Sequence, residues 1–483
     1  MHYSSGKYSH MSNAFSSLFI SQMGHPPTKD QLILIDRMSR FIDKKEGNWA
    51  FIIRGYAGTG KTTTVGAMVK ALPKLGLKSL LLAPTGRAAK VLSTFSNKRA
   101  FTIHKAIYQV KTSPEGLSKF VLAANKMQNT IFIVDEASMI SDAAGLSNSG
   151  FGSSRSLLDD LMEFVFSGHN CKLIFIGDTA QLPPVGMDLS PALEPKFLQS
   201  AFPIHLKGAE LKEVVRQQYD SGILYNATKL RLALLTDDFN IKFEIDGYPD
   251  IIRLGGDELE DVLNDCYSND GEDHSIVICR SNKRANLFNG QIRQRIRWME
   301  DEIATGEYIM IVKNNYFWLD EKSKAGFIAN GDIAEIMRLG NTEEMYGFRF
   351  VDATIRLVDY PEEPLVETKL LLNSLESESP ALDPADYRLL YERVLEDYAD
   401  ESNRQKKYEL LKKNPYYNGL QIKFAYAITC HKSQGGQWKN VIIDQGYLTQ
   451  EMIDTAYIRW LYTAITRATQ KLYLLNFNER FFN

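Results

Sequence analysis

The sequence predicts an α/β protein made of two parallel-sheet units, with a small β-barrel and a helical insertion inside the second unit. Three observations lead to this prediction. The chain has 483 residues, more than one ordinary core fills, so two or three domains are expected. Short apolar runs alternate with amphipathic stretches in two parts of the chain, which is typical of parallel strands covered by helices. A β-rich stretch of different character interrupts the second of these parts.

Eight apolar runs are the predicted strands of the two sheets. In the first unit they are Ala50–Arg54, Ser79–Ala83, Thr130–Val134 and Lys172–Ile176. In the second unit they are Ser275–Cys279, Lys423–Thr429, Asn440–Ile443 and Lys471–Leu475. Their length and their content of branched apolar residues favour strands that are buried on both faces.

The stretch 313–422 is the predicted inserted region. It begins with strand-like text, and the pair Asn330–Gly331 is typical of a tight hairpin turn. Later, Asp383–Pro384 has the pattern of a helix start, with an N-cap followed by proline at the first helical position. We therefore expect a small barrel that carries helices. A further segment, 145–156, contains eight Gly or Ser residues in twelve and predicts a flexible loop of unassigned role.

Composition indicates a globular protein rather than a disordered or fibrous one. Hydrophobic residues make up 44% of the chain and charged residues 24%, and the net charge of −3 argues mildly against a nucleic-acid partner. That average conceals two unlike parts. Residues 359–401 hold 13 acidic and 3 basic residues, so the remaining 440 residues carry a net charge of +7. The basic remainder suits a groove that follows phosphates, and the acidic stretch suits a protein partner.

The four cysteines are scattered and form no metal-binding or disulfide pattern, which predicts a reducing, cytoplasmic setting. No apolar run approaches the roughly 18 residues of a membrane span. Residues 1–25 are polar and rich in serine, lack the pattern of a secretory signal, and are expected to form a mobile tail.

The segment GYAGTGKT, from Gly55 to Thr62, predicts a phosphate-binding loop between a strand and a helix. Glycines allow backbone N–H groups to approach phosphate oxygens, and the helix N-terminus adds positive potential. Lys61 is expected to reach the β- and γ-phosphates, and the Thr62 hydroxyl to bind Mg²⁺. The alternative is a glycine-rich turn with an exposed lysine. The predicted nucleotide contacts are Gly55, Ala57, Gly58, Thr59, Gly60, Lys61, Thr62 and Thr63.

A pair of acids follows the buried run Thr130–Val134. Asp135 is placed to hold Mg²⁺, and Glu136 to orient or deprotonate the attacking water. Two adjacent carboxylates repel each other, so a cation beside them is favoured over a solvated loop with two acids. Together with the phosphate loop, this pair predicts hydrolysis of ATP or GTP, with Mg²⁺.

Further motifs then follow in a set order, and the set resembles that of the superfamily 1B helicases of RecD/Dda type. The segments that carry the resemblance are PTKDQ (27–31), LLAPTGRAAK (81–90), FTIHKAI (101–107), FIGDTAQLPPV (175–185), LKEVVRQ (211–217), ITCHKSQGGQW (428–438) and YTAITRAT (462–469). The resemblance implies two RecA-like domains and an ATP-driven motor that moves along single-stranded DNA, usually 5′ to 3′, and unwinds duplex.

The resemblance also assigns roles to individual residues. Gln31 is expected to contact adenine, although Thr28 and Gln31 also match a capping box that opens a helix, and both can hold. Gln181 is expected to sense the γ-phosphate, and Arg216 and Arg467 to act as arginine fingers. The predicted DNA contacts are Pro84, Thr85, Arg87, Lys90, His104, Thr429, His431, Lys432 and Gln434.

The resulting domain plan is a tail (1–25), a first RecA-like domain (26–215) with a strand-separating pin hairpin at about 105–127, a second RecA-like domain (216–312 and 423–483) and the insertion (313–422). ATP and Mg²⁺ are the expected cofactors. Single-stranded and tailed duplex DNA are the expected partners, with a repair or replication protein at the acidic insertion and a monomer as the working form. The alternatives are a helicase directed to RNA and a nucleotide-gated DNA-binding subunit of a repair complex.

Overall fold

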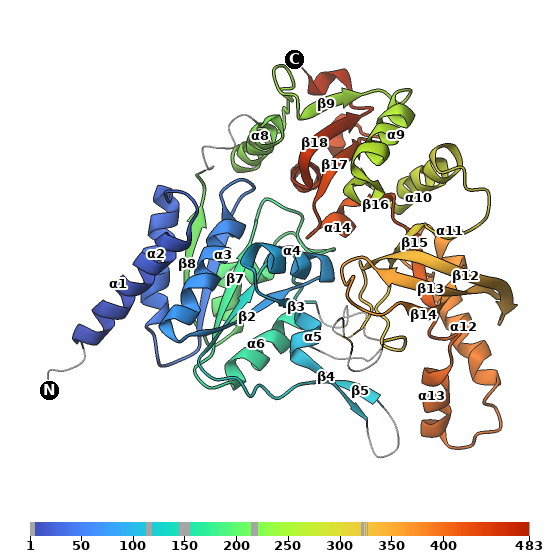
Figure 1. Cartoon of the computed structure of the whole chain (residues 1–483), viewed down its shortest axis with the longest axis horizontal. Coiled ribbons are helices and arrows are strands. Elements are labelled where there is room, and N and C mark those ends of the chain that lie inside the picture. The colour runs from blue at the N-terminus through green and yellow to red at the C-terminus, as the bar shows by residue number, and fades with distance from the viewer. Residues whose placement is uncertain are drawn as a thin grey trace.

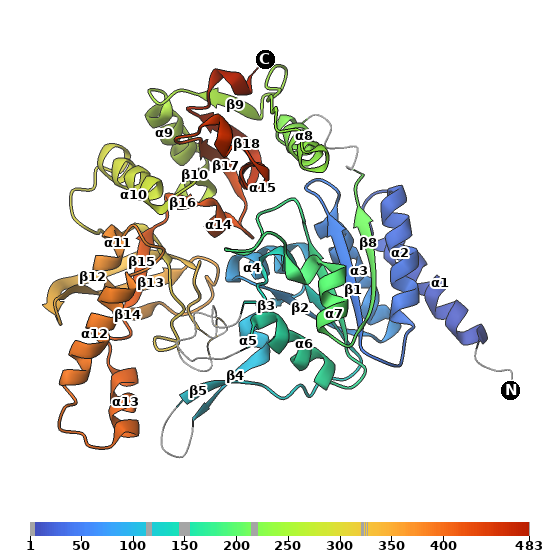
Figure 2. The same ribbon diagram turned by 180° about the vertical axis from the view of Figure 1, so that it is seen from behind.

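The computed structural model describes residues 5–112, 118–143, 155–213, 221–319, 323, 325 and 327–482. Two sheets and a closed barrel follow one another in space (Figure 1). The first sheet is near the N-terminus, and the second lies beside the C-terminus. The barrel is at the far end of the molecule from the N-terminal helix, as the reverse view also shows (Figure 2). The predicted fold class, two parallel-sheet RecA-like units with an inserted barrel, is confirmed.

The first sheet has six parallel strands in the order β3-β2-β6-β7-β1-β8. Its strands are β1 (Trp49–Gly55), β2 (Lys78–Ala83), β3 (Ala100–Thr102), β6 (Thr130–Val134), β7 (Lys172–Gly177) and β8 (His205–Leu211). The four predicted strands correspond to β1, β2, β6 and β7. The edge strands β3 and β8 were missed because one is only three residues long and the other alternates between half-exposed and exposed residues at its start.

Helices cover both faces of this sheet. They are α1 (Ser5–Gln22), α2 (Lys29–Ile42), α3 (Lys61–Ala71), α4 (Gly86–Ser96), α5 (Ile103–Ile107), α6 (Leu157–Ser167) and α7 (Pro195–Ala201). One core lies between the sheet and α1 to α4, and a second core lies between the sheet and α5 to α7. Because both faces are covered, the central strands are buried along their whole length, which explains their continuous apolar text.

The expectation of a mobile tail at residues 1–25 is wrong. Within the described part of this segment, residues Ser5–Gln22 form α1, and the side chains of Phe15 and Phe19 are each only 1% exposed. They join the core shared with α2 and α3, with their rings 5.4 Å apart in an edge arrangement. The single apolar patch in polar text was sufficient to dock the helix, because two buried aromatic rings remove a large apolar area from water.

The second sheet has five parallel strands in the order β16-β10-β17-β18-β9. They are β9 (Ile251–Leu254), β10 (Ser275–Cys279), β16 (Ala427–Thr429), β17 (Trp438–Asp444) and β18 (Ala468–Leu475). The associated helices are α8 (Gly222–Thr236), α9 (Leu259–Asp270), α10 (Asn282–Gln291), α14 (Cys430–Ser433) and α15 (Thr455–Ile465). Helices α8 and α15 pack on one face, and α9 and α10 pack on the other.

The barrel consists of β11 (Tyr308–Ile311), β12 (Ile333–Met345), β13 (Phe348–Leu357), β14 (Val366–Leu371) and β15 (Leu420–Phe424). The predicted strand 423–429 is therefore wrong as a single element, since its start belongs to the barrel and its end to the second sheet. The barrel also extends beyond the expected limits 313 and 422 at both ends. The sequence pattern did not locate the junctions between the barrel and the second unit, because the apolar residues continue across them without a break.

The helical insertion lies between β14 and β15 and contains α11 (Asn373–Glu376), α12 (Pro384–Glu396) and α13 (Arg404–Lys413). Proline occupies the first turn of α12, as its sequence indicated. The Asn330–Gly331 pair does form a turn, with Gly331 at φ +97°, but β11 and β12 are separated by residues 312–332, so it is not a two-residue hairpin.

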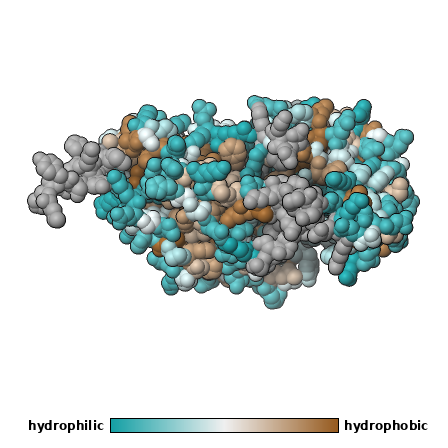
Figure 3. All heavy atoms as spheres, turned by 90° about the horizontal axis from the view of Figure 1, so that it is seen from below, coloured by the Kyte–Doolittle hydropathy of each residue, from teal (hydrophilic) through white to brown (hydrophobic). Residues whose placement is uncertain are grey.

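Two further predicted features lie partly outside the described residues. Strands β4 (Tyr108–Thr112) and β5 (Ser118–Leu122) pair antiparallel and project from the first unit (Figure 2), within the range proposed for the pin. Most of the Gly/Ser loop is outside the described residues, and its last residue, Ser156, caps α6. Among the described helices, none has the length and apolar character to cross a membrane, and the face seen in Figure 3 is largely hydrophilic.

The docking of α1 generates a stability prediction. Phe19→Ala removes a buried ring and is expected to lower the free energy of unfolding by about 3 kcal/mol in urea titrations. Ile20→Ala, next to it but 38% exposed, is the matched control and is expected to change it by less than about 0.5 kcal/mol. Equal, negligible effects would mean that α1 does not dock in solution.

Candidate nucleotide site and nucleic-acid interface

The phosphate loop joins β1 to α3, as the sequence predicted. Gly58 and Gly60 adopt the left-handed backbone conformation, with φ of +76° and +75°, which glycine enters without steric cost. Gly60 is the N-cap of α3, and Thr59 closes the loop by donating from Oγ1 to the Tyr56 carbonyl over 2.8 Å. The helix N-terminus and its backbone N–H groups therefore form a cradle suited to an anion.

Lys61 folds back over this loop. Its Nζ donates to the Tyr56 carbonyl over 2.8 Å and lies 3.7 Å from Asp178 Oδ2. Asp178 follows β7 and is fully buried. The ammonium therefore lies beside a buried carboxylate and close to the loop that is predicted to bind phosphate.

The acid pair lies at the end of β6. The Asp135 carboxylate accepts the Glu136 N–H over 2.9 Å, and the Asp135 N–H donates to the Leu82 carbonyl over 2.9 Å. Glu136 has φ +52°, an unusual conformation for a residue with a side chain, of a kind that is found at functional sites.

Burial, followed by the charge of Glu136, raises the pKa of Asp135 to about 7, while Lys61 opposes that rise. A divalent cation would relieve the repulsion between these carboxylates. The residues present therefore fit Mg²⁺, with Asp135 and the Thr62 hydroxyl as its protein contacts.

Gln31 forms the capping box rather than a free recognition group. The Gln31 side-chain Oε1 accepts the Thr28 backbone N–H over 3.0 Å, and the Gln31 backbone N–H donates to Thr28 Oγ1 over 3.3 Å. Its Nε2 donates to the Thr59 carbonyl over 3.3 Å and approaches Thr64 Oγ1 at 3.4 Å. The side chain is fully buried, so it fastens α2 to the phosphate loop, and its adenine contact stays a prediction.

Three side chains from the second unit hold the segment after β7, and we call this set of contacts the interlock. The Tyr462 hydroxyl, on α15, accepts the Ala57 N–H over 2.8 Å and donates to Asp178 Oδ2 over 2.7 Å. Thr463 Oγ1 accepts the Leu182 N–H over 2.8 Å, and Gln434 Nε2 donates to the Leu182 carbonyl over 2.8 Å. The phosphate loop and the second unit are thus joined through one buried phenol.

Sequence reasoning gave Tyr462 and Thr463 no role, although both lie in the quoted segment YTAITRAT. The available signal was their position, four and five residues before Arg467, near the end of a helix. Gln434 is only 6% exposed, which favours a linking role over the predicted DNA contact. Gln181 is buried as well, and its Oε1 accepts no hydrogen bond from the described residues.

Of the two predicted arginine fingers, only Arg467 lies in the described part of the chain, and its printed contacts are with residues of its own unit. Arg467 is buried, and its guanidinium donates to the Thr463 and Gly436 carbonyls over 3.0 and 3.3 Å. Within the described part of the chain it forms no ion pair, so its charge remains available to an anion. Arg216 lies outside the described residues.

A second cluster gathers many of the predicted DNA contacts where the two units meet. The Arg87 guanidinium lies over the Trp438 ring at 4.0 Å, and Thr85 caps α4. A Cβ added to Gly435, which has φ +74°, would lie 2.9 Å from the Ala88 Cβ. The paired glycines of this motif therefore permit close contact between the two units, which gives them a physical role.

The barrel lies against the same cluster. Lys90 donates to the Val358 carbonyl over 3.1 Å and lies 3.4 Å from Asp359, and Lys432 donates to Asn330 Oδ1. Burial lowers the pKa of Lys432 to about 8. Both lysines therefore already contact polar groups of the barrel in the same chain.

The remaining predicted contacts differ in accessibility. The His104 ring lies between Tyr108 and Phe327, and burial lowers its pKa to about 4, so it is a neutral group near pH 7. His431 is exposed, whereas Pro84 and Thr429 are half-buried beside the cluster.

Comparison with known proteins matches both units. Residues 42–233 match the family model of an AAA domain, and residues 424–475 match that of the UvrD-like helicase C-terminal domain. The chain is 32% identical to the ATP-dependent RecD2 DNA helicase of Deinococcus radiodurans over 34% of this chain and 20% of that protein. It is 28% identical to the ATP-dependent DNA helicase dda of Enterobacteria phage T4 over 64% of this chain and 66% of that protein.

Among solved structures, the chain is similar to Pif1 helicase from Bacteroides in complex with ADP-AlF3 and ssDNA. That similarity covers 95% of each chain, at 15% identity and a TM-score of 0.48. The chain spans only a fifth of the RecD2 relative and about two thirds of the Dda relative. The two family models cover most of the ordered motifs, and with the two curated helicases they support the predicted similarity to superfamily 1B helicases.

Proposed function

We propose that this protein is an ATP-driven motor that moves along single-stranded DNA, in the 5′ to 3′ direction, and unwinds duplex. The observation that carries the proposal is the interlock, because it connects the phosphate loop directly to the unit that bears Arg467 and the predicted strand contacts. A nucleotide that alters this connection alters the contact between the two units.

The nucleotide chemistry follows from the residues of the loop and the acid pair. Lys61 and the loop N–H groups hold the phosphates, Thr62 and Asp135 hold Mg²⁺, and Glu136 orients and deprotonates a water. Bound MgATP supplies the phosphoryl group that this water attacks. Gln181 has a buried carbonyl oxygen able to accept a hydrogen bond from that water.

Coupling follows from competition for one backbone group. Ala57 N–H donates to the Tyr462 hydroxyl, yet the same N–H belongs to the cradle expected to bind phosphate. Phosphate binding therefore draws Ala57 away from Tyr462, while Tyr462 keeps its bond to Asp178 or rotates. Helix α15 ends two residues before Arg467, so its movement brings the finger toward the phosphates and shifts the Gly436 segment beside Arg87.

Hydrolysis is expected to depend on two separable side chains. Lys61→Ala should abolish both ATP binding and turnover, and Glu136→Gln should retain ATP binding while turnover falls by about 10²–10⁴-fold. Fluorescent-nucleotide binding and phosphate release, each with and without single-stranded DNA, measure the two effects. Lys70→Ala, at an exposed position on α3, is the matched control and should leave both unchanged. Normal turnover in Glu136→Gln would exclude it as the base.

The interlock makes a different prediction. Tyr462→Phe removes the competitor for Ala57 N–H, so the KM for ATP should stay the same or fall by about two- to tenfold, the equivalent of one hydrogen bond. DNA-stimulated kcat should fall, since the link to α15 is lost. Tyr457→Phe, whose ring stacks on Trp460 in the same helix, is the control. A raised KM with normal kcat would show that the hydroxyl only assists binding.

Direction and substrate are tested together by unwinding of tailed duplexes. A duplex with a 5′ single-stranded DNA tail should be opened, and one with only a 3′ tail should not. Preference for the 3′ tail would contradict the proposed direction. The same tails made of RNA distinguish a motor directed to RNA, and DNA binding without unwinding or DNA-stimulated ATPase would leave only a gated binding subunit.

A further inference from the structure

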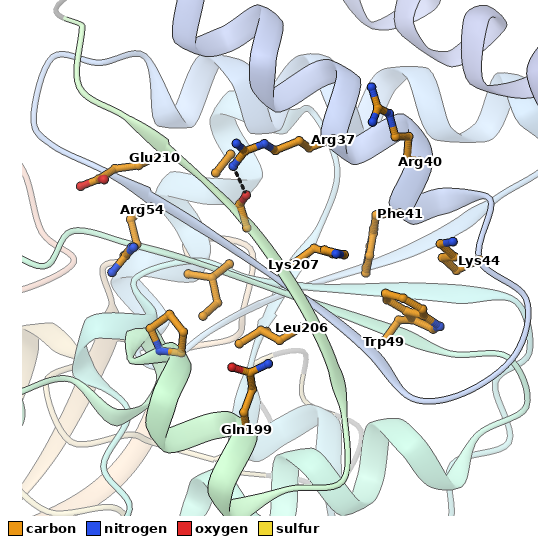
Figure 4. Close-up of a pocket in the computed structure, with 14 residues that line it drawn as sticks. Arg37, Arg40, Phe41, Lys44, Trp49, Arg54, Gln199, Leu206, Lys207 and Glu210 are labelled. Atoms are coloured by element: carbon orange, nitrogen blue, oxygen red, sulfur yellow. Dashed lines mark hydrogen bonds between the residues drawn. The ribbon is translucent and has the colours of Figure 1, made fainter.

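A basic groove follows the outer edge of the first sheet, on strand β8. Its volume is about 770 Å³, and helix α2 flanks it on one side and α7 on the other (Figure 4). Five cationic side chains line it against a single acid, and they are Arg37, Arg40, Lys44, Arg54 and Lys207 against Glu210. We call this the β8 groove. None of the helicase motifs contributes a charged side chain to it.

The charges of the groove are only partly neutralised. Arg40 pairs with Asp36 over 2.8 Å, but both side chains are more than half exposed, which makes that pair weak. Glu210 is already engaged, because it accepts from the Tyr56 hydroxyl and pairs with Lys212. Arg37 donates to a backbone carbonyl rather than a carboxylate. A net positive field therefore faces the groove.

The floor of the groove is an open strand edge. Among the strands that the structure describes, β8 pairs only with β1, in parallel. The His205 N–H points toward β1, where it donates to the Asn48 carbonyl over 2.8 Å. Alternation along the strand therefore points the N–H and C=O groups of Leu206, Gly208 and Glu210 outward. Arg37 supports this geometry, because it reaches the Gly208 carbonyl from outside over 2.8 Å.

These features point to one class of occupant. We propose that the β8 groove binds an extended acidic peptide segment of a partner protein, which adds to the sheet as a strand beside β8. The outward peptide groups supply main-chain hydrogen bonds, and the cations supply charge complementarity. Trp49 and Leu206 add apolar wall for the alternate side chains.

A peptide accounts for the groove better than a nucleic acid does. A nucleic acid has no ladder of amide groups to match the strand edge. The groove also lies at the β8 edge of the sheet, whereas the predicted strand contacts Thr85 and His104 follow β2 and β3 at the opposite edge.

The test uses a fluorescein-labelled peptide of about eight residues that alternates Asp and Val, the length of β8 with one residue added. Fluorescence anisotropy at low salt should show binding to the full chain, and the matched Asn/Val peptide should bind at least about tenfold more weakly. The double variant Arg37→Glu, Lys207→Glu should lose at least about tenfold in affinity. Lys74→Glu, an exposed charge reversal in the same unit, should not.

Methylated peptides test the strand addition itself. N-methylation of all Asp residues or of all Val residues blocks the N–H groups on one edge of the peptide, so one of the two should lose binding and the other retain it. Retention by both would overturn pairing with β8. Failure of the unmodified acidic peptide to bind would overturn the proposal as a whole.

Two further measurements separate the occupants. If the double variant instead weakens binding of an oligo-dT strand, the groove holds nucleic acid. If it abolishes a concentration-dependent dimer in sedimentation velocity, the groove holds a second copy of this chain. Either result would overturn the proposal. DNA-stimulated ATPase of the double variant should remain within about twofold of the unmodified protein, so failure here is distinct from failure of the motor function.

Discussion

The phenol of Tyr462 is the contact on which communication between the two units depends. It joins the Ala57 N–H of the phosphate loop to the Asp178 carboxylate, from a helix that belongs to the other sheet. Asp178 is buried and Ala57 is half-buried, so removing the hydroxyl deprives the Ala57 N–H of its acceptor and the Asp178 carboxylate of one of its donors. Thr463 and Gln434 fix the neighbouring Leu182 backbone, which keeps the phenol in register.

The same region holds charged side chains away from water, and a ligand of opposite charge would stabilise them. Asp178 is buried and Asp135 is half-buried, both at strand ends; Lys61 pairs with Asp178 and acts electrostatically on Asp135. Arg467 is buried among neutral oxygens. Anion and cation sites are thus prepared on opposite units, which explains how a small anionic ligand with a divalent cation could draw the units together.

The site was predictable wherever chemistry depends on local spacing. The phosphate loop and the acid pair follow β1 and β6. They lie at the same edge of the sheet because parallel strands have their carboxyl ends at one edge. Gln31 shows the limit of that reasoning. Its sequence context fits both an adenine contact and a helix-capping box, and the structure contains the capping box. α1 shows another limit, because two buried phenylalanines outweighed the polar text around them.

By itself, the sequence determined the fold class, the phosphate loop, the order of the motifs and the separation of an acidic insertion from a basic remainder. Each of these follows from local composition or from residues close together in the chain. Only the tertiary structure decided that Tyr462 reaches Ala57, that Gly435 meets Ala88, and that a basic groove lies on β8. Those contacts join residues hundreds of positions apart or depend on strand order, and neither spacing nor periodicity encodes such distances.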